Sequence, residues 1–92
     1  MIKSFRHKGL EKFYTSGNKA GIQAKHAPKL RRILGLLDAA TIPDDVNLPG
    51  FRLHPLAGKQ QGFYSVWVNG NWRVIFRFVG EDVELVDYLD YH

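Results

Sequence analysis

The residues best suited to acid–base chemistry lie together at the carboxyl end of the sequence, which reads DYLDYH. Asp90, Tyr91 and His92 offer a carboxylate, a phenol and an imidazole, groups that take up, donate and orient protons. In a regular strand Asp90 and His92 project to one face and Tyr91 to the other, so all three serve one site only where the strand end bends. In the alternative interpretation, Tyr91 packs into the core while Asp90 and His92 lie in solvent.

His54 is a second acid–base candidate, and its value depends on its distance from His92. Pro55 biases the backbone of His54 toward the β region. A single histidine is more often a residue of the surface or of the core edge than a catalyst. If the last strand brings His92 close to His54, however, the two imidazoles supply one base and one acid near neutral pH.

Two arginines alternate with apolar residues in the segment WRVIFRFV, residues 72–79. Because neighbouring residues of a strand point to opposite faces, Arg73 and Arg77 share the face turned away from the core. A guanidinium group matches two phosphate oxygens at once and stays charged, so both arginines are candidate phosphate ligands. The alternative is that they pair with acids of neighbouring strands, such as Glu84 or Asp87.

The sequence lacks the usual metal and nucleophile motifs. His54, Asp90 and His92 are three ligands in principle, but no HxxxH motif or acidic cluster at coordination spacing accompanies them. There is no cysteine, which excludes thiol nucleophiles, disulfides and cysteine zinc sites. Ser65 lies inside a predicted strand rather than on a strand-to-helix elbow. We therefore predict no metal and no other cofactor.

The charge of the chain is divided unevenly. The net charge is +4, but residues 1–35 carry nine Lys and Arg against one acid, whereas residues 36–92 carry four against eight. A basic surface of this kind attracts polyanions, of which nucleic acid is the commonest. The alternative is an ordinary solvated helix face.

The hydrophobic pattern predicts a single domain over residues 1–92, with a helical first part. Residues 1–5 are predicted as a short strand and residues 7–16 as a first helix that Gly17 ends. Residues 27–41 are predicted as a second helix, with Pro28 in its first turn. Its apolar residues at helical spacing are Leu30, Ile33, Leu34 and Leu37.

The second part of the chain predicts strands. Residues 41–51 are predicted as a loop, and a brief extended segment follows over 52–56. Asn69-Gly70 predicts a hairpin turn. The predicted strands are residues 62–68, 72–79 and 83–91. The fold class is thus α+β, with two N-terminal helices packed on a small antiparallel sheet of three to five strands.

The sequence contains no predicted membrane segment. No apolar run approaches the roughly 18 residues of a membrane span. The opening MIKSFRHKG also lacks the apolar region of a signal peptide. We expect a cytoplasmic protein without a membrane partner.

Taken together, four segments resemble the HigB-type toxins of the RelE superfamily over essentially the whole chain. They are the opening MIKSFRHKGL, the LHPL segment before a glycine, the hairpin YSVWVNGNWRVIFRF and the ending DYH. The resemblance implies a RelE-like microbial ribonuclease-type fold and the toxic half of a bacterial type II toxin–antitoxin pair. Such toxins bind the A site of the 70S ribosome and cut the messenger RNA there without a metal. A HigA-type helix-turn-helix antitoxin neutralises them, and operator DNA is contacted only through that antitoxin.

The resemblance also implies roles for individual residues. His54, Asp90, Tyr91 and His92 correspond to the catalytic cluster, and Arg73 to the arginine that binds the phosphate. Asn71 and Lys59 are expected beside the substrate with Arg77. Relatives often have a lysine where this chain has Ala57; either Lys59 takes over part of its role, or the site works with less positive charge. The residues expected to contact 16S ribosomal RNA are Lys25, Lys29, Arg31 and Arg32. The alternative function is a non-catalytic protein that binds RNA or the ribosome and blocks translation by occupancy.

Overall fold

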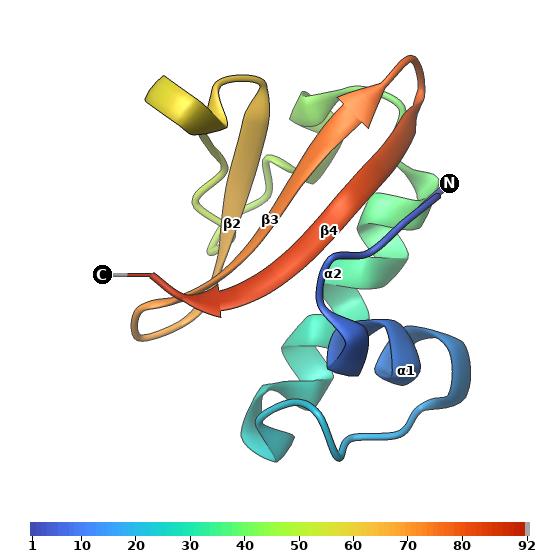
Figure 1. Ribbon diagram of the computed structural model, residues 1–92. Helices are drawn as coiled ribbons and strands as arrows, with labels where there is room; N and C mark the ends of the chain where they lie inside the picture. Colours follow the sequence, from blue (N-terminus) through green and yellow to red (C-terminus); the bar gives the residue numbers. More distant parts are fainter. Residues whose placement is uncertain (92) are drawn as a thin grey trace.

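The sheet is an antiparallel meander of four strands, and the two helices pack on one of its faces (Figure 1). The computed structural model describes residues 1–91. The strands lie side by side in chain order, each antiparallel to the next. They are β1 His54–Pro55, β2 Phe63–Asn69, β3 Trp72–Val79 and β4 Asp82–Asp90. This is the predicted α+β fold.

Both predicted helices are confirmed, within the first 39 residues. Helix α1 spans Lys8–Ser16, and its first turn is capped by Nδ1 of His7, which accepts the Leu10 N–H at 2.9 Å. Gly17 ends α1 in the left-handed conformation, with φ +78°. Helix α2 spans Ala27–Ala39 and has a proline in its first turn, as predicted. Short 3-10 helices are η1 Ala24–His26, η2 Pro43–Val46 and η3 Gly58–Gln60.

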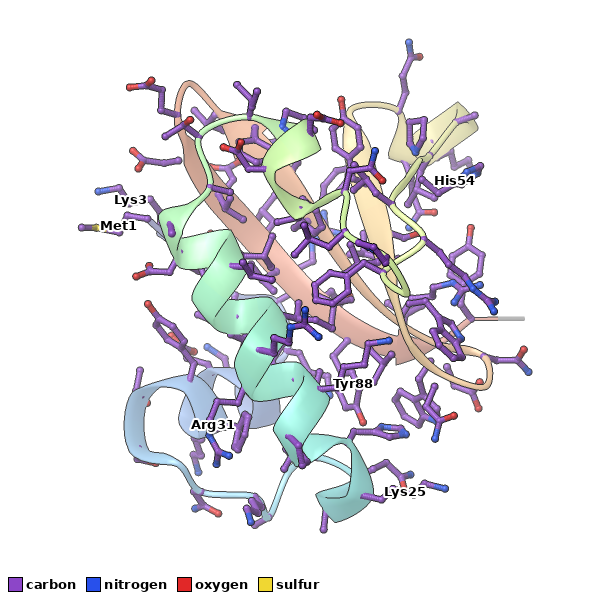
Figure 2. All side chains as sticks on the ribbon, turned by 180° about the vertical axis from the view of Figure 1, so that it is seen from behind. Met1, Lys3, Lys25, Arg31, His54 and Tyr88 are labelled. Atoms are coloured by element: carbon purple, nitrogen blue, oxygen red, sulfur yellow. The ribbon has the colours of Figure 1, made fainter. Side chains whose placement is uncertain are left out.

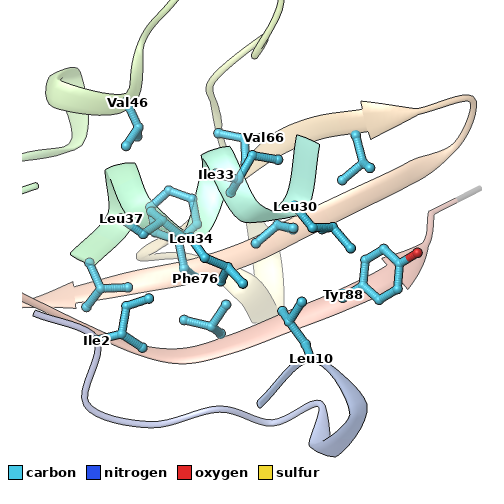
Figure 3. Close-up of a cluster of buried hydrophobic side chains, with 14 of the residues drawn as sticks. Ile2, Leu10, Leu30, Ile33, Leu34, Leu37, Val46, Val66, Phe76 and Tyr88 are labelled. Carbon is cyan, nitrogen blue, oxygen red and sulfur yellow. The ribbon is translucent and has the colours of Figure 1, made fainter. Parts of the chain in front are cut away.

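The core lies between α2 and the sheet (Figure 3). The four apolar residues that the helical spacing of α2 singles out are each at most 2% exposed. Full burial of one such side chain stabilises the fold by roughly 1.5–3 kcal/mol. Their partners on the sheet include Val66, Val74, Phe76, Val83, Val86 and Tyr88. Among residues 1–91, no helix is long and apolar enough to cross a membrane.

The β2–β3 hairpin is confirmed, with its turn one residue later than predicted. Trp67 pairs with Arg73, but the next pair is Asn69 with Trp72, so β2 contains an extra residue. The two-residue turn is therefore Gly70-Asn71, and Gly70 has φ +56°. A β-bulge of this kind cannot be read from alternation alone, because the extra residue interrupts the period of two.

A second bulge, in β4, sets which side chains of the last strand face the core. Ile75 pairs with Asp87, and Arg77 pairs with Glu84, so β4 advances by three residues where β3 advances by two. Leu85 takes up the difference with φ +55°, a conformation rare outside glycine. Beyond the bulge, residues 87, 89 and 91 share the face that points away from the helices.

The opening segment does not form the continuous strand that we predicted. It lies beside β4 through two isolated parallel bridges, Ile2 with Val83 and Phe5 with Val86. Between them the side chain of Ser4 accepts the Leu85 N–H at 2.9 Å. The bulge at Leu85 therefore interrupts the parallel ladder.

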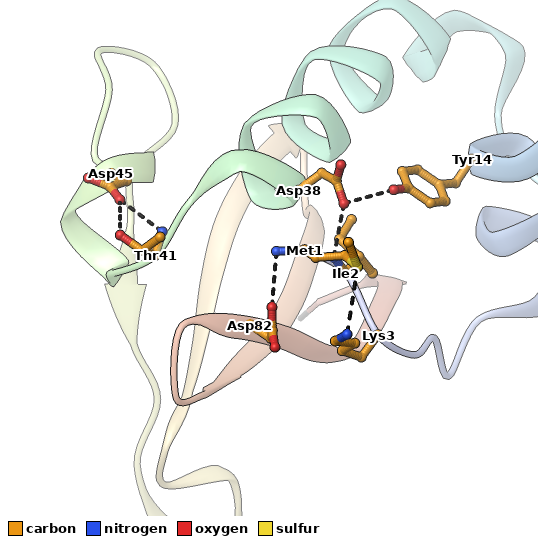
Figure 4. A network of polar contacts seen from close by, with 8 residues as sticks. All are labelled: Met1, Ile2, Lys3, Tyr14, Asp38, Thr41, Asp45 and Asp82. Atoms are coloured by element: carbon orange, nitrogen blue, oxygen red, sulfur yellow. Dashed lines mark hydrogen bonds and ion pairs between the residues drawn. The ribbon is translucent and has the colours of Figure 1, made fainter.

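Polar contacts fasten this segment to the rest of the chain (Figure 4). The Asp38 carboxylate accepts the Ile2 N–H at 3.0 Å and the Tyr14 hydroxyl at 2.9 Å. Hydrogen bonds from Ile2 and Tyr14 lower the pKa of Asp38. The amino group of Met1 lies 3.4 Å from the Asp82 carboxylate. The segment thus covers the outer edge of β4, which would otherwise present unpaired backbone groups.

Two glycines give a matched pair of stability predictions. A Cβ on Gly9 of α1 would lie 2.5 Å from the Gly21 carbonyl oxygen, so the two backbones leave no room for a side chain. Gly35 of α2 is exposed, and a Cβ there would meet nothing within 4 Å. We expect Gly9→Ala to lower the free energy of unfolding by about 1–3 kcal/mol. Gly35→Ala should raise it by about 0.5–1 kcal/mol, since alanine favours the helix. Urea unfolding measures both, and a shift of the same sign in both variants would contradict this packing.

A buried histidine gives a prediction about pH. His26 is 2% exposed, and its Nδ1 lies 2.6 Å from the Tyr88 hydroxyl, which also accepts the Gln23 N–H at 3.4 Å. The other ring nitrogen, Nε2, is buried without a partner among the described residues. Burial, and then the charge of Lys25, lower the pKa of His26 below its ordinary value of 6.5. The neutral form is therefore the one that this site favours.

The sign of the pH effect follows from this direction. Below pH 6.5 the unfolded chain binds a proton on His26 more readily than the folded chain, so stability should fall as the pH is lowered through that range. His26→Gln keeps an acceptor for Tyr88 but does not titrate. Urea unfolding at pH 7.5 and pH 5.5 should show a smaller loss for His26→Gln than for the parent protein. Equal losses in the two proteins would remove His26 as the cause.

Candidate active site

A cavity of about 670 Å³ opens on the face of the sheet that points away from the helices. Three separate parts of the chain line it: the extended segment around β1, the centre of the β2–β3 hairpin, and the residue after β4. The lining residues are Arg52, Leu53, His54, Pro55, Leu56, Ala57, Ser65, Arg73 and Tyr91. The structure therefore brings His54, Arg73 and Tyr91 together around one space.

The strand register explains this convergence. His54 pairs with Ser65, and Ser65 pairs with Ile75, so the three side chains lie in one row across the sheet. Arg73 lies two residues before Ile75 on β3 and projects to the same face. The Tyr91 N–H donates to the Asn71 carbonyl oxygen at 2.7 Å, which continues the β3–β4 ladder by one step.

Tyr91 and Asp90 separate at the end of β4. Tyr91 is 39% exposed and lines the cavity, so it does not pack into the core as the alternative interpretation had it. Asp90 is exposed, lies opposite Trp72 in the register, and is not among the described residues that line the cavity. His92 lies outside the described residues. The placement of Tyr91 depends on the bulge at Leu85, since a slip of one residue exchanges the faces of a strand.

Arg73 and Arg77 have different surroundings, although both have the same place in the alternating pattern of β3. Arg77 donates to the Glu84 carboxylate through Nε at 2.8 Å and through Nη2, which is the ion pair that we weighed as the alternative. Arg73 is half-buried, and its Nη1 is buried without a hydrogen-bond partner within residues 1–91. A buried donor without a partner is costly, and an anion in the cavity would satisfy it. Arg73 is therefore the better phosphate ligand.

Two other predicted substrate residues lie beside the cavity rather than in its lining. Lys59 is exposed in η3, and among residues 1–91 it is not part of the lining. Asn71 is in the β2–β3 turn and contacts Tyr91 through its backbone. Ala57 does line the cavity. Neither Ala57 nor Lys59 therefore adds a positive charge to the lining formed by residues 1–91.

Arg52 is a residue of the cavity that our sequence reasoning missed. It lines the same space and is exposed, and its backbone has φ +51°. Its guanidinium carbon lies 4.3 Å from the centre of the Trp67 ring. The signal in the sequence that could have identified Arg52 was its positive charge two positions before His54, in a segment that we expected to be extended.

The four basic residues predicted to contact ribosomal RNA differ in what their side chains contact. Figure 2 shows Lys25 and Arg31 toward one end of the molecule and His54 toward the other. The guanidinium carbon of Arg31 lies 5.4 Å from the Phe13 ring centre, whereas that of Arg32 lies 5.3 Å from the Phe51 ring centre. Lys25, Arg31 and Arg32 are exposed.

Lys29 is more restricted than the other three. Its amino group donates to the Gly50 carbonyl oxygen at 3.1 Å and lies 4.2 Å from the centre of the Trp67 ring. Burial, followed by the charges of Arg32 and Arg52, lowers the pKa of Lys29. The ammonium group is thus engaged within the protein.

Within residues 1–91, no group of three His, Asp or Glu residues lies close enough together to bind a metal ion.

Proteins of known family resemble this chain over its whole length. The family of the RelE-like toxin of the type II toxin–antitoxin system HigB matches residues 3–92. The chain is 38% identical over 92 residues to the Endoribonuclease HigB of Proteus vulgaris, covering 100% of both. It is 37% identical over 94 residues to Toxin HigB-1 of Vibrio cholerae, covering 100% of this chain and 98% of the relative.

A solved structure supports the fold. The crystal structure of a YafQ mutant from E. coli superposes with a TM-score of 0.61 at 20% identity, covering 96% of this chain and 89% of that chain. With the family match over residues 3–92 and the two full-length relatives, the conclusion is direct: the chain belongs to the family of HigB-like toxins.

Proposed function

We propose that this chain is a ribosome-dependent endoribonuclease that cuts messenger RNA in the A site and so inhibits translation and growth. The observation that carries the proposal is the cavity where His54, Arg73 and Tyr91 meet, with a buried N–H of Arg73 left unpartnered among the described residues. Its volume of about 670 Å³ is in the usual range for small-ligand sites, enough for a nucleotide. The printed name of the Proteus vulgaris relative, an endoribonuclease, supports the same activity.

The reaction would use the RNA's own 2′-hydroxyl as the nucleophile. The 2′-oxygen forms a bond to the adjacent phosphorus while the bond from phosphorus to the 5′-oxygen breaks. A base takes the proton of the 2′-hydroxyl, and an acid gives a proton to the departing 5′-oxygen. The products are a 2′,3′-cyclic phosphate and a 5′-hydroxyl. No metal is needed where a base, an acid and a cation are positioned around the phosphate.

We assign these parts to the proposed site residues. From the resemblance, His92 or Asp90 is the base, and His54 is the acid or the group that steadies the phosphate. The base and acid labels exchange if His54 proves to be the base. Arg73 stabilises the negative charge that develops on the phosphorane, because it lines the cavity and its guanidinium keeps an unused donor among the described residues. Tyr91 orients the scissile nucleotide by hydrogen bonding or stacking.

The partners follow from the same proposal. The exposed cations Lys25, Arg31 and Arg32 bind 16S ribosomal RNA, in a manner that weakens with salt. A HigA-type helix-turn-helix antitoxin neutralises the toxin, and operator DNA is reached only through it. The protein acts in the cytoplasm, where the ribosomes are.

The rival function is occupancy of the ribosome without cleavage. Brief induction of the toxin followed by mapping of messenger RNA 5′ ends distinguishes the two. Cleavage should give discrete new ends inside coding regions within minutes. Inhibited translation with intact messages would instead establish blockade and end the nuclease proposal.

A further inference from the structure

We propose that Arg52 binds the phosphate of the message next to the scissile one, as a second cation beside Arg73. This inference rests on the proposed function and deepens it, because it assigns a substrate contact to a residue outside the predicted site. Arg52 lines the cavity two residues before His54, the proposed acid. Arg73 reaches the same cavity from β3. Arg52 and Arg73 thus border one space from different segments of the chain.

Arg52 has an unusual backbone conformation, and its guanidinium packs on a fixed aromatic ring. Its φ of +51° is unusual for a residue with a side chain, and such conformations concentrate at functional sites. The guanidinium rests 4.3 Å from the centre of the Trp67 ring. That ring is itself fixed, because its Nε1 donates to the Gly70 carbonyl oxygen at 2.8 Å and the Trp67 backbone N–H donates to the Phe51 carbonyl oxygen at 2.7 Å.

The charge around Arg52 is not compensated by acids. Among the described residues, Arg52 makes no ion pair, in contrast to Arg77. Lys29 contacts the same indole ring at 4.2 Å, so two cations share Trp67. The charges of Arg32 and Arg52 contribute to the lowered pKa of Lys29, a sign of repulsion between them. A phosphate would relieve this repulsion, and arginine can bind it with two donors.

Arg52 also supplies positive charge that other residues of the cavity wall lack. Ala57 in the cavity wall is uncharged, and Lys59 is outside the lining formed by residues 1–91. Of the described residues that line the cavity, the cations are Arg52 and Arg73, with His54 as the imidazole. If a second positive charge acts on the message here, Arg52 is the residue placed to supply it.

A double-mutant cycle, with one change in the protein and one in the RNA, tests the contact between Arg52 and the phosphate. The message bound to the programmed ribosomes carries one uncharged methylphosphonate linkage in place of a phosphate. This linkage is placed in turn on either side of the cleavage site. We expect Arg52→Ala to lower kcat/KM on the unmodified message by about tenfold, and one of the two neutral linkages to lower it similarly for the parent protein. The two changes together should cost little more than either alone, because they remove the same contact.

Two further variants separate this role from packing against Trp67. Arg52→Lys keeps a cation near the ring and should recover part of kcat/KM while still responding to the same linkage. Arg6→Ala is the control, because Arg6 also lies over an aromatic ring, 5.0 Å from the centre of Phe63, and does not line the cavity. It should leave cleavage unchanged.

Two results would overturn the inference while the proposed function stands. One is cleavage by Arg52→Ala at the parent rate. The other is full independence of the two changes, in which the fold-loss in kcat/KM from Arg52→Ala multiplies with the fold-loss from each neutral linkage. Failure of the parent protein to cut the unmodified message would instead refute the proposed function.

Discussion

Arg73→Ala is expected to lower the rate of message cleavage by about 10²–10³-fold, the usual effect of removing one donor that stabilises charge in the transition state. The reason is that Arg73 lines the cavity and that its buried Nη1 has no partner within residues 1–91. Single-turnover cleavage on programmed ribosomes measures the effect. Arg73→Lys should recover only part of the rate, because an ammonium group keeps the charge but not the two-pronged donor geometry.

The stability of the same variants distinguishes a catalytic role from a structural one. A buried donor without a partner is unfavourable, so replacing Arg73 by an apolar residue of similar length should not destabilise the fold. We expect Arg73→Met to lose activity and to keep, or increase, its free energy of unfolding in urea. A large loss of stability would mean that Arg73 holds the sheet together. Parent-like cleavage by both variants would remove Arg73 from the mechanism.

His54→Ala is expected to lower cleavage by about 10²–10⁴-fold, the range for one positioned acid or base. His54 is exposed on the short strand β1, so the substitution should leave the fold unchanged. A message with sulfur in place of the 5′-oxygen at the cleavage site defines the role, because a thiolate leaves without being protonated. If His54 is the acid, the variant should cut this message at nearly the parent rate.

The contrary outcomes are equally informative. A loss of the same size on both messages would exclude His54 as the acid and would leave it as the base or as the group that steadies the phosphate. Unchanged cleavage of the ordinary message by His54→Ala would exclude His54 from either role. Circular dichroism and urea unfolding of the variant exclude misfolding as the cause of a loss.

Much of the fold could be predicted because its signals are local. The apolar residues of α2 recur at helical spacing, and all four are buried. The hairpin was predicted from a glycine-containing turn between two alternating segments, and β2 and β3 pair as expected. In each case a short stretch of sequence contains the whole physical cause of the structure.

The features that could not be predicted depend on contacts between distant segments. The bulge at Leu85 is fixed by Ser4, 81 residues away in the sequence, and it decides that Tyr91 faces the cavity. Arg73 and Arg77 occupy equivalent places in the alternation of β3, but only the register of β4 puts Glu84 beside Arg77. Arg52 was missed because its positive φ breaks the extended pattern that the segment predicts.

The central claim is that positioned side chains activate the message's own 2′-hydroxyl. The most direct test is to identify the chemical groups at the ends of the cut RNA. The same message is also prepared with 2′-deoxyribose instead of ribose at the scissile nucleotide. The account predicts a 2′,3′-cyclic phosphate and a 5′-hydroxyl on the ribose message, and no cut in the deoxyribose message. A 5′-phosphate with a 3′-hydroxyl, or cleavage of the deoxyribose message at the normal rate, would mean attack by water and would contradict the account.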